Sequence, residues 1–208
     1  MATTPDAVVI GAGHNGLTCA CYLARAGLKV LVLEQGATVG GMTNTEEVTL
    51  PGFHSDTHAF GYQLANLSPA PRELELHRHG FELIHPEIGW THSFSGGPPI
   101  SVFRDVERSC QSIGAVSIAD ARTWRELHRR FCDASEAIAA SLHQPPPSPS
   151  DQLRAIEGSP EGLQDYRFQL QSLRAWARET FESEATRLMI GTWCSHVGLA
   201  PDLSLIHI

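Results

Sequence analysis

Positively charged residues are scarce in this sequence, and lysine is almost missing. The 208 residues include 15 Lys and Arg against 23 Asp and Glu, which gives a formal charge of −8, and Lys29 is the single lysine. A protein that neutralises nucleic-acid phosphates needs clustered cations, and this chain has no run of them. The composition therefore argues against a nucleic-acid binder, and we expect no nucleic-acid partner.

Paired cysteines and metal-ligand spacings are also missing. The five cysteines form no C-x-x-C pair and no spacing typical of zinc sites; they stand at positions 19, 21, 110, 132 and 194. His54, Asp56 and His58 form an H-x-D-x-H sequence, but it is turn-like and no further ligand follows nearby. We therefore expect no metal site and no disulfide framework, which favours a reducing, cytoplasmic compartment.

The N-terminal residues show a strand, helix and strand in close succession. Val8-Val9-Ile10 is an apolar, β-branched run that predicts a strand buried on both faces of a parallel sheet. Small and apolar residues then recur at helical spacing over 15–26, and Gly27 stands where a left-handed helix cap is expected. A second apolar run covers 30–33. The pattern predicts a βαβ unit with a right-handed crossover.

Between the first strand and the helix lies a glycine motif of the form G-x-G-x-x-G. Gly11 permits a tight turn, Gly13 lets a pyrophosphate approach the backbone, and Gly16 allows close packing of helix and strand. The exposed N–H groups and the helix dipole favour phosphate at this point. Glu34 follows at the end of the second strand, where a carboxylate accepts hydrogen bonds from the adenosine ribose, each worth roughly 1.5–3 kcal/mol. The alternative is a glycine turn that binds no nucleotide.

The residues after Glu34 distinguish between dinucleotides. The negative charge of Glu34 would repel a ribose 2′-phosphate, so NADP is disfavoured. No third helix and strand follow at once; instead Gly40 and Gly41 let the backbone approach the nucleotide a second time. Asn15 could cap the helix as well as touch the cofactor. The predicted cofactor-binding residues are Gly11, Ala12, Gly13, His14, Asn15, Gly16, Glu34, Gln35, Gly40, Gly41 and Met42.

Residues 6–60 resemble the N-terminal signature of the phytoene-desaturase-like flavoproteins, which are related to the flavin amine oxidases. After the glycine motif and Glu34, the shared pattern has G-x-x-x-G-G and then Pro51-Gly52-Phe53. Three further sequences look most like the branch containing pyridine nucleotide-disulphide oxidoreductase domain proteins and ketolase-like carotenoid enzymes. They are Gly-Ala-Gly-His-Asn-Gly-Leu, Thr45-Glu46-Glu47, and the stretch from Leu74-Glu75-Leu76 to His79-Gly80-Phe81.

The resemblance implies FAD as the cofactor and oxidation of a hydrophobic small molecule by hydride transfer to the flavin. It places His54, Asp56 and His58 near the flavin or the substrate entrance. The expected location is cytoplasmic, and peripheral contact of the protein with a membrane stays open as an alternative. Met42 stands where many amine oxidases have an arginine, so that family's flavin contact is not carried over. No residue is assigned a catalytic role.

Beyond residue 62 the sequence predicts an α+β region. We expect a short helix over 72–79 closed by Gly80, and antiparallel strands over 81–94 and 100–103. A capping box of Ser117 and Asp120 precedes a long helix. Its apolar stripe comprises Trp124, Leu127, Phe131, Ala134, Ile138 and Leu142. The aromatic residues Trp124, Phe131, Trp176 and Phe181 are expected to be core, with the lining of a substrate channel as the alternative. Further helices are predicted over 164–178 and 184–195.

The fold class expected from these observations is α/β: a Rossmann-like FAD-binding βαβ unit over 1–62, followed by part of an α+β substrate region over 63–202. Residues 203–208 look like a non-native tail. The resembling flavoproteins are roughly twice as long or more, and their second glycine–acid motif has no counterpart here. We therefore expect an N-terminal fragment of an FAD-dependent oxidoreductase. The alternatives are a non-catalytic, escort-like binding protein on the same scaffold and an inactive fragment.

Overall fold

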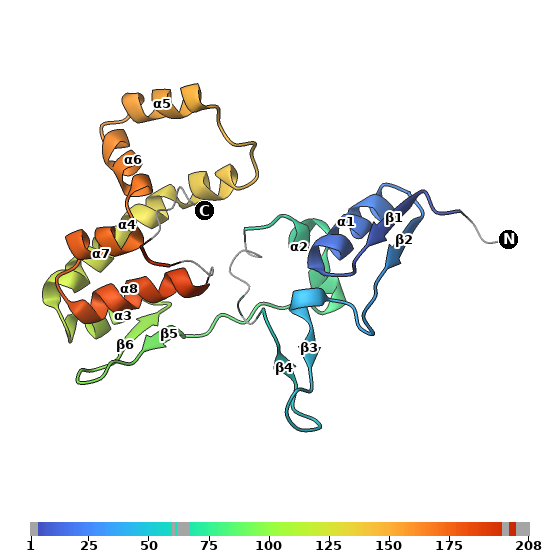
Figure 1. Cartoon of the computed structure of the whole chain (residues 1–208), viewed down its shortest axis with the longest axis horizontal. Coiled ribbons are helices and arrows are strands. Elements are labelled where there is room, and N and C mark those ends of the chain that lie inside the picture. The colour runs from blue at the N-terminus through green and yellow to red at the C-terminus, as the bar shows by residue number, and fades with distance from the viewer. Residues whose placement is uncertain (1–3, 60, 62–66, 197–199, 203–208) are drawn as a thin grey trace. The chain divides into compact units, whose positions relative to one another are not determined.

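The computed structural model describes residues 4–59, 61, 67–196 and 200–202, with side chains described as far as Thr192 and again from Ala200. The chain divides between Ile84 and His85 into two compact units, which are taken in turn below. Figure 1 labels their helices and strands. The predicted domain boundary falls on residues 62–66, outside the described residues, and stays a prediction.

The first unit begins with the predicted βαβ arrangement. Strand β1 spans Ala7–Ile10, helix α1 spans His14–Arg25 and strand β2 spans Val30–Leu33. The two strands pair in parallel, with Ala7 opposite Val30 and Ile10 opposite Leu33, and Figure 1 shows α1 lying along them. Gly27, with a φ of 89°, ends the helix as expected. The parallel pairing confirms the βαβ prediction.

The two-stranded sheet has one covered and one uncovered face. Val9 faces α1, because its side chain lies next to Gly16. On the other face Val8, Ile10 and Leu33 are 51%, 85% and 47% exposed, and within the described residues no element covers them. The prediction of strands buried on both faces is therefore wrong for this structure. A continuous apolar run signals burial on two sides, but only α1 packs on this pair.

Short elements complete the first unit. They are the 3-10 turn η1 (Gly41–Thr43), the antiparallel pair β3 (Thr45–Glu46) and β4 (Ser55–Asp56), helix α2 (Ala70–Glu73) and the 3-10 turn η3 (Leu76–His79). The single helix predicted over 72–79 is thus two turns, because Glu75 between them has a φ of 51°. Gly80, with a φ of 85°, ends the second turn as predicted.

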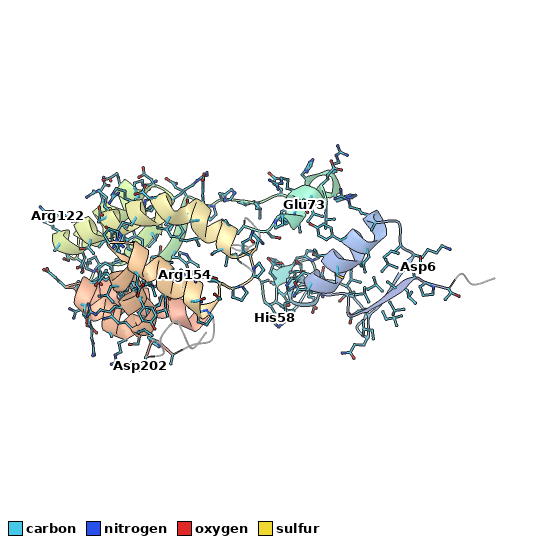
Figure 2. All side chains as sticks on the ribbon, turned by 90° about the horizontal axis from the view of Figure 1, so that it is seen from above. Asp6, His58, Glu73, Arg122, Arg154 and Asp202 are labelled. Carbon is cyan, nitrogen blue, oxygen red and sulfur yellow. The ribbon has the colours of Figure 1, made fainter. Side chains whose placement is uncertain are left out.

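Helix α2 is attached to α1 through Glu73, which Figure 2 labels. The Tyr22 hydroxyl donates a hydrogen bond of 2.6 Å to the Glu73 carboxylate, and the Arg25 guanidinium donates to the Glu73 carbonyl oxygen. The hydrogen bond to Glu73 is the largest cause of a raised pKa for Tyr22. These contacts join residues distant in sequence, so no local pattern could have predicted them.

The second unit combines a hairpin with six helices among its described residues. Strands β5 (Ile88–His92) and β6 (Ile100–Phe103) are antiparallel, as predicted, although residues 81–87 and 93–94 of the predicted first strand lie outside β5. The helices are α3 (Val106–Gly114), α4 (Ile118–Ser141), α5 (Pro149–Gly158), α6 (Gly162–Leu170), α7 (Leu173–Thr180) and α8 (Glu184–His196). The sequence analysis missed α3 and α5 and merged α6 with α7. Helices α4 and α8 are confirmed.

Ser172 explains why α6 and α7 are separate. Its backbone is extended, with a ψ of 150°, and its hydroxyl accepts a hydrogen bond of 3.1 Å from the Ala175 N–H group. A side-chain oxygen that satisfies an N–H group of the first turn begins a new helix. Helix α3 begins in the same way at Asp105, whose carboxylate accepts from the Glu107 N–H group at 2.7 Å.

The core of the second unit brings together β6 and four helices. Ile100, Ile113, Phe181 and Met189 are its largest apolar members, and each is 0–1% exposed. Trp124 and Trp176 pack against this core and Phe181 belongs to it, as the core interpretation of the aromatic residues predicted. Phe131 does not follow it, because its side chain is 61% exposed.

Asp120 has a different role from the one that its spacing suggested. The Ser117 hydroxyl accepts from the Asp120 N–H group at 3.1 Å, which is one half of a capping box. The Asp120 carboxylate, however, is buried and accepts hydrogen bonds from the N–H groups of Glu182 at 2.7 Å and Ser183 at 3.0 Å. It therefore fastens the start of α4 to the residues that precede α8, and the predicted reciprocal box is wrong.

Candidate dinucleotide-binding site

The turn between β1 and α1 leaves the start of the helix open. Gly11 has a φ of 97°, a conformation that disfavours residues with a side chain, and its N–H group donates to the Leu33 carbonyl oxygen at 2.7 Å. Gly13 is the residue before the helix and has no side chain to cap it. The N–H groups of the first turn are thus free of a side-chain cap, as a phosphate site requires.

Asn15 does not cap the helix, so that alternative for it is wrong. It lies within the first turn of α1, and the capping position belongs to Gly13, with no side-chain capping bond among the described residues. His14 is exposed at the same end. Both side chains stand beside the open helix start.

The second glycine pair lies directly against the first turn. The Gly40 N–H group donates to the Ala12 carbonyl oxygen at 2.8 Å, and Gly13 and Gly40 form a parallel bridge. A Cβ atom on Gly41 would stand 3.0 Å from the Gly13 Cα, and its φ of 58° also favours glycine. The closeness of the two segments therefore explains the glycine at position 41, whereas a Cβ atom on Gly13 would make only an ordinary contact of 3.9 Å with the Gly41 Cα.

The carboxylate of Glu34 joins the two segments on the strand side. One oxygen accepts from the Ala12 N–H group at 2.7 Å and the other accepts from the Gly36 N–H group at 2.9 Å. The hydrogen bond from Gly36, followed by that from Ala12, lowers the pKa of Glu34. A carboxylate has about four lone-pair sites, so an exposed group with two backbone donors keeps acceptors for two ribose hydroxyls.

The structure brings nearly all the predicted cofactor-binding residues to this one place. Ala12 is buried within the turn, Gln35 follows Glu34, and Met42 is 60% exposed on η1 beside the glycine pair. The assignment of these residues to a cofactor stays a prediction.

Polar residues that the sequence analysis did not select hold the second glycine pair in place. The Thr43 hydroxyl donates to the Gly40 carbonyl oxygen at 2.8 Å. The Asn44 amide donates to the Thr38 hydroxyl at 2.9 Å and to the Glu46 carboxylate at 2.6 Å. These short-range contacts could have been suspected from Thr and Asn beside a glycine turn, since both often bond to nearby turn backbone.

The H-x-D-x-H residues have local partners. His54 Nε2 lies 3.5 Å from the Glu47 carboxylate, Asp56 accepts from the Thr45 hydroxyl at 2.6 Å, and His58 Nδ1 lies 3.0 Å from the Thr57 hydroxyl. Across the part of the chain that the structure describes, no group of three or more His, Cys, Asp or Glu side chains is arranged to hold a metal ion.

Comparison with protein families agrees with this geometry. Residues 9–86 match the model of the NAD(P)-binding Rossmann-like domain, which begins in β1 and includes the glycine motif, Glu34 and the second glycine pair. This part of the chain has a Rossmann-like fold. The sequence analysis expected that fold from the same residues, and its α/β class is confirmed.

The curated relatives carry oxidoreductase names. A limonene dehydrogenase subunit of Castellaniella defragrans is 38% identical over 131 residues, which are 63% of this chain and 24% of the relative. Pyridine nucleotide-disulfide oxidoreductase domain-containing protein 2 of Rattus norvegicus is 38% identical over 127 residues, 57% of this chain and 21% of that protein. The chain thus spans about a quarter or less of these relatives.

Among solved structures, a redesigned triple mutant of putrescine oxidase aligns with 92% of this chain and 37% of its own, with a TM-score of 0.50 and 21% identity. At that identity the likeness concerns the fold alone. Of the helices with described residues, none combines the length and apolar character needed to cross a membrane.

Proposed function

We propose that this chain supplies the dinucleotide-binding part of an FAD-dependent oxidoreductase of the phytoene-desaturase-like group, with a hydrophobic small molecule as substrate. The single observation that carries the proposal is the meeting of Glu34 with the two glycine segments around an uncapped helix start. The oxidoreductase names of the relatives support it.

The residues fit the adenosine diphosphate half of such a cofactor. The N–H groups at the start of α1 would bind the diphosphate, and Gly13, the residue before the helix, places no side chain over them. Glu34, held by Ala12 and Gly36, would accept the ribose hydroxyls without having to reorient. Its lowered pKa keeps it ionised at neutral pH.

When bound, the flavin would supply the redox chemistry, accepting a hydride from the substrate. The chain's own contribution is to bind and orient the nucleotide end. The charge of Glu34 also acts on specificity, because a 2′-phosphate placed beside a carboxylate is repelled. A ligand with a free adenosine ribose is therefore favoured over NADP.

The test is a titration of the 208-residue chain with FAD, followed by flavin fluorescence, with ADP and FMN as competitors. FMN carries the isoalloxazine and ribityl phosphate but no adenosine, so ADP should displace FAD and FMN should not. The substitution Glu34→Gln should weaken FAD binding by about tenfold or more, since it removes one charged hydrogen-bond acceptor. Equal competition by FMN and ADP would contradict the proposed site.

Glu82→Gln is the matched control. Glu82 is an exposed carboxylate of the same unit with no partner among the described residues, so its neutralisation should leave FAD affinity unchanged. A second experiment compares NAD with NADP. NADP should bind more weakly than NAD to the native chain, and Glu34→Gln should reduce this difference in affinity. Unchanged FAD affinity after Glu34→Gln would remove the ribose assignment.

A further inference from the structure

A cleft in the second unit lies between α7 and α8, separate from the dinucleotide residues. Its volume is about 410 Å³, within the range of small-molecule sites. Figure 1 shows the two helices side by side. The lining residues come from one face of each helix and from the chain beyond them: Arg174, Ala177, Arg178, Glu184, Arg187, Leu188, Gly191, Thr192 and Pro201.

Two of the three cleft arginines already have partners. The Arg174 guanidinium forms an ion pair of 3.1 Å with Asp202, which Figure 2 labels. The backbone N–H group of Arg174 donates to the Pro201 carbonyl oxygen at 2.9 Å. Arg187 donates to the carbonyl oxygens of Phe181 at 2.8 Å and Arg178 at 3.4 Å, so it caps the end of α7.

Among the described residues, the Arg178 side chain is the cleft cation without an ion-pair partner. The cleft region has three arginines and two carboxylates, because Glu184 lies 3.8 Å from Arg187 and Asp202 pairs with Arg174. Counted over the described residues, this leaves one positive charge in excess. The guanidinium of Arg178 is exposed and has no ion pair or hydrogen bond to any described residue.

Gly191, which lines the cleft, is a second observation that indicates open space there. A glycine inside a helix costs about 1 kcal/mol relative to alanine, so it usually answers a packing need. Here a Cβ atom would meet nothing within 4 Å. No described neighbour therefore requires glycine, and what its missing side chain provides is room in the cleft. Leu188, one turn earlier, is 50% exposed on the same face and gives an apolar wall.

We propose that this cleft binds a small molecule with one carboxylate on an apolar body. The carboxylate would pair with Arg178, because guanidinium binds carboxylates through two parallel hydrogen bonds. The apolar body would lie over Gly191 between Leu188 and Pro201. One excess positive charge matches one negative charge. The proposal concerns the helical unit and does not depend on the proposed dinucleotide site.

Calorimetric titration of the 208-residue chain with octanoate tests this proposal, with octanol and octylammonium as matched probes of neutral and opposite charge. Octanoate should bind saturably to one site, octanol about tenfold or more weakly, and octylammonium not at all. Arg178→Gln should reduce octanoate affinity to that of octanol. Arg122→Gln, which alters an exposed arginine on α4 labelled in Figure 2, should leave it unchanged.

A second variant tests whether octanoate binding requires the space in the cleft beside Gly191, rather than the charge of Arg178. Gly191→Leu should fill the cleft and abolish octanoate binding, while the chain remains folded because the position is open and leucine favours helix more than glycine does. Equal binding of octanoate and octanol, no saturable octanoate binding, or full affinity in either Arg178→Gln or Gly191→Leu would overturn the proposal. None of these results would bear on FAD binding.

Discussion

At Gly16 the space for a side chain is taken by the backbone of the preceding turn. A Cβ atom there would overlap the Gly11 carbonyl oxygen and stand 3.4 Å from the Val9 side chain. The closest atom belongs to the backbone, so it cannot rotate away. Helix α1 can pack against β1 only because residue 16 is glycine.

Gly16→Ala should therefore destabilise the first unit by about 1–3 kcal/mol, the usual cost of overpacking, and weaken FAD binding as the turn opens. Urea unfolding followed by circular dichroism measures the first effect. Gly61→Ala is the control in the same unit, since a Cβ there meets nothing within 4 Å and the φ of Gly61 lies outside the left-handed region. Equal stability of the two variants would refute the packing argument.

Because of Glu34, the stability of the same turn depends on pH. Its folded pKa is lowered by the N–H groups of Gly36 and Ala12, so the carboxylate stabilises the turn above the unfolded pKa of about 4.3. That contribution is lost as the pH falls through the lower, folded pKa. The amide-proton shifts of Ala12 and Gly36 should thus titrate with a midpoint below that of a free glutamate. A midpoint at or above the free value would contradict the two hydrogen bonds.

At the scale of elements, Asp120 fastens together two helices whose starts are far apart in sequence. Its buried carboxylate satisfies the N–H groups of Glu182 and Ser183, and Ser183 in turn caps α8 by accepting from Thr186 at 3.4 Å. Without that carboxylate, two partly buried N–H donors would lose their partner, at a cost of about 1–3 kcal/mol.

Asp120→Ala should lower the free energy of unfolding of the second unit by that amount, measured by urea unfolding with tryptophan fluorescence. Asp133→Asn is the control, because Asp133 forms an exposed ion pair with Arg129 on the same helix, and such pairs contribute less than about 1 kcal/mol. If both variants unfold at the same urea concentration, Asp120 is not the link that its hydrogen bonds indicate.

The contrast between Asp120 and Gly11 shows where sequence reasoning succeeds. The first strand, the glycine turn, α1 and β2 follow one another within a short stretch, so spacing alone predicted them and most of the candidate site. The role of Asp120 depends on Glu182, which only the folded chain brings near. Local spacing assigned it to a capping box, and no pattern within one helix could have corrected that.

The burial of strand faces and the ends of helices were also predicted only in part. The run Val8-Val9-Ile10 predicts a strand, but what covers each face depends on other elements. Helix α3 was missed although Val106, Cys110 and Ile113 recur at helical spacing and Asp105 caps its start. The break at Ser172 follows from its own cap, a signal that was present in the sequence and was not read.

For the whole molecule, the apolar core is distributed very unevenly. The buried apolar residues of the first unit, within the described part, are Ala12 and Ala20, whereas the second unit has eight, including Phe181, Met189 and Ile113. Burial of large apolar side chains is the main source of stability, so the two units should differ in stability.

We expect the 208-residue chain to unfold in two steps, the first unit at lower urea. All four tryptophans, at positions 90, 124, 176 and 193, belong to the second unit, so fluorescence reports that unit alone, while far-ultraviolet circular dichroism reports both. Part of the dichroism should be lost before the fluorescence changes. Coincident transitions would mean that the units unfold together.

The bonds from Asp120 to residues 182 and 183 have one more consequence. They hold together the two ends of the long segment from residue 120 to residue 183. The ends of this segment contribute to the core, whereas residues in its middle are exposed, among them Phe131, Leu142, Leu153 and Leu163. The entropy of closing a loop grows only with the logarithm of its length. The exposed middle of this segment can therefore be lengthened or shortened at little entropic cost, so a reporter inserted there should leave the core intact.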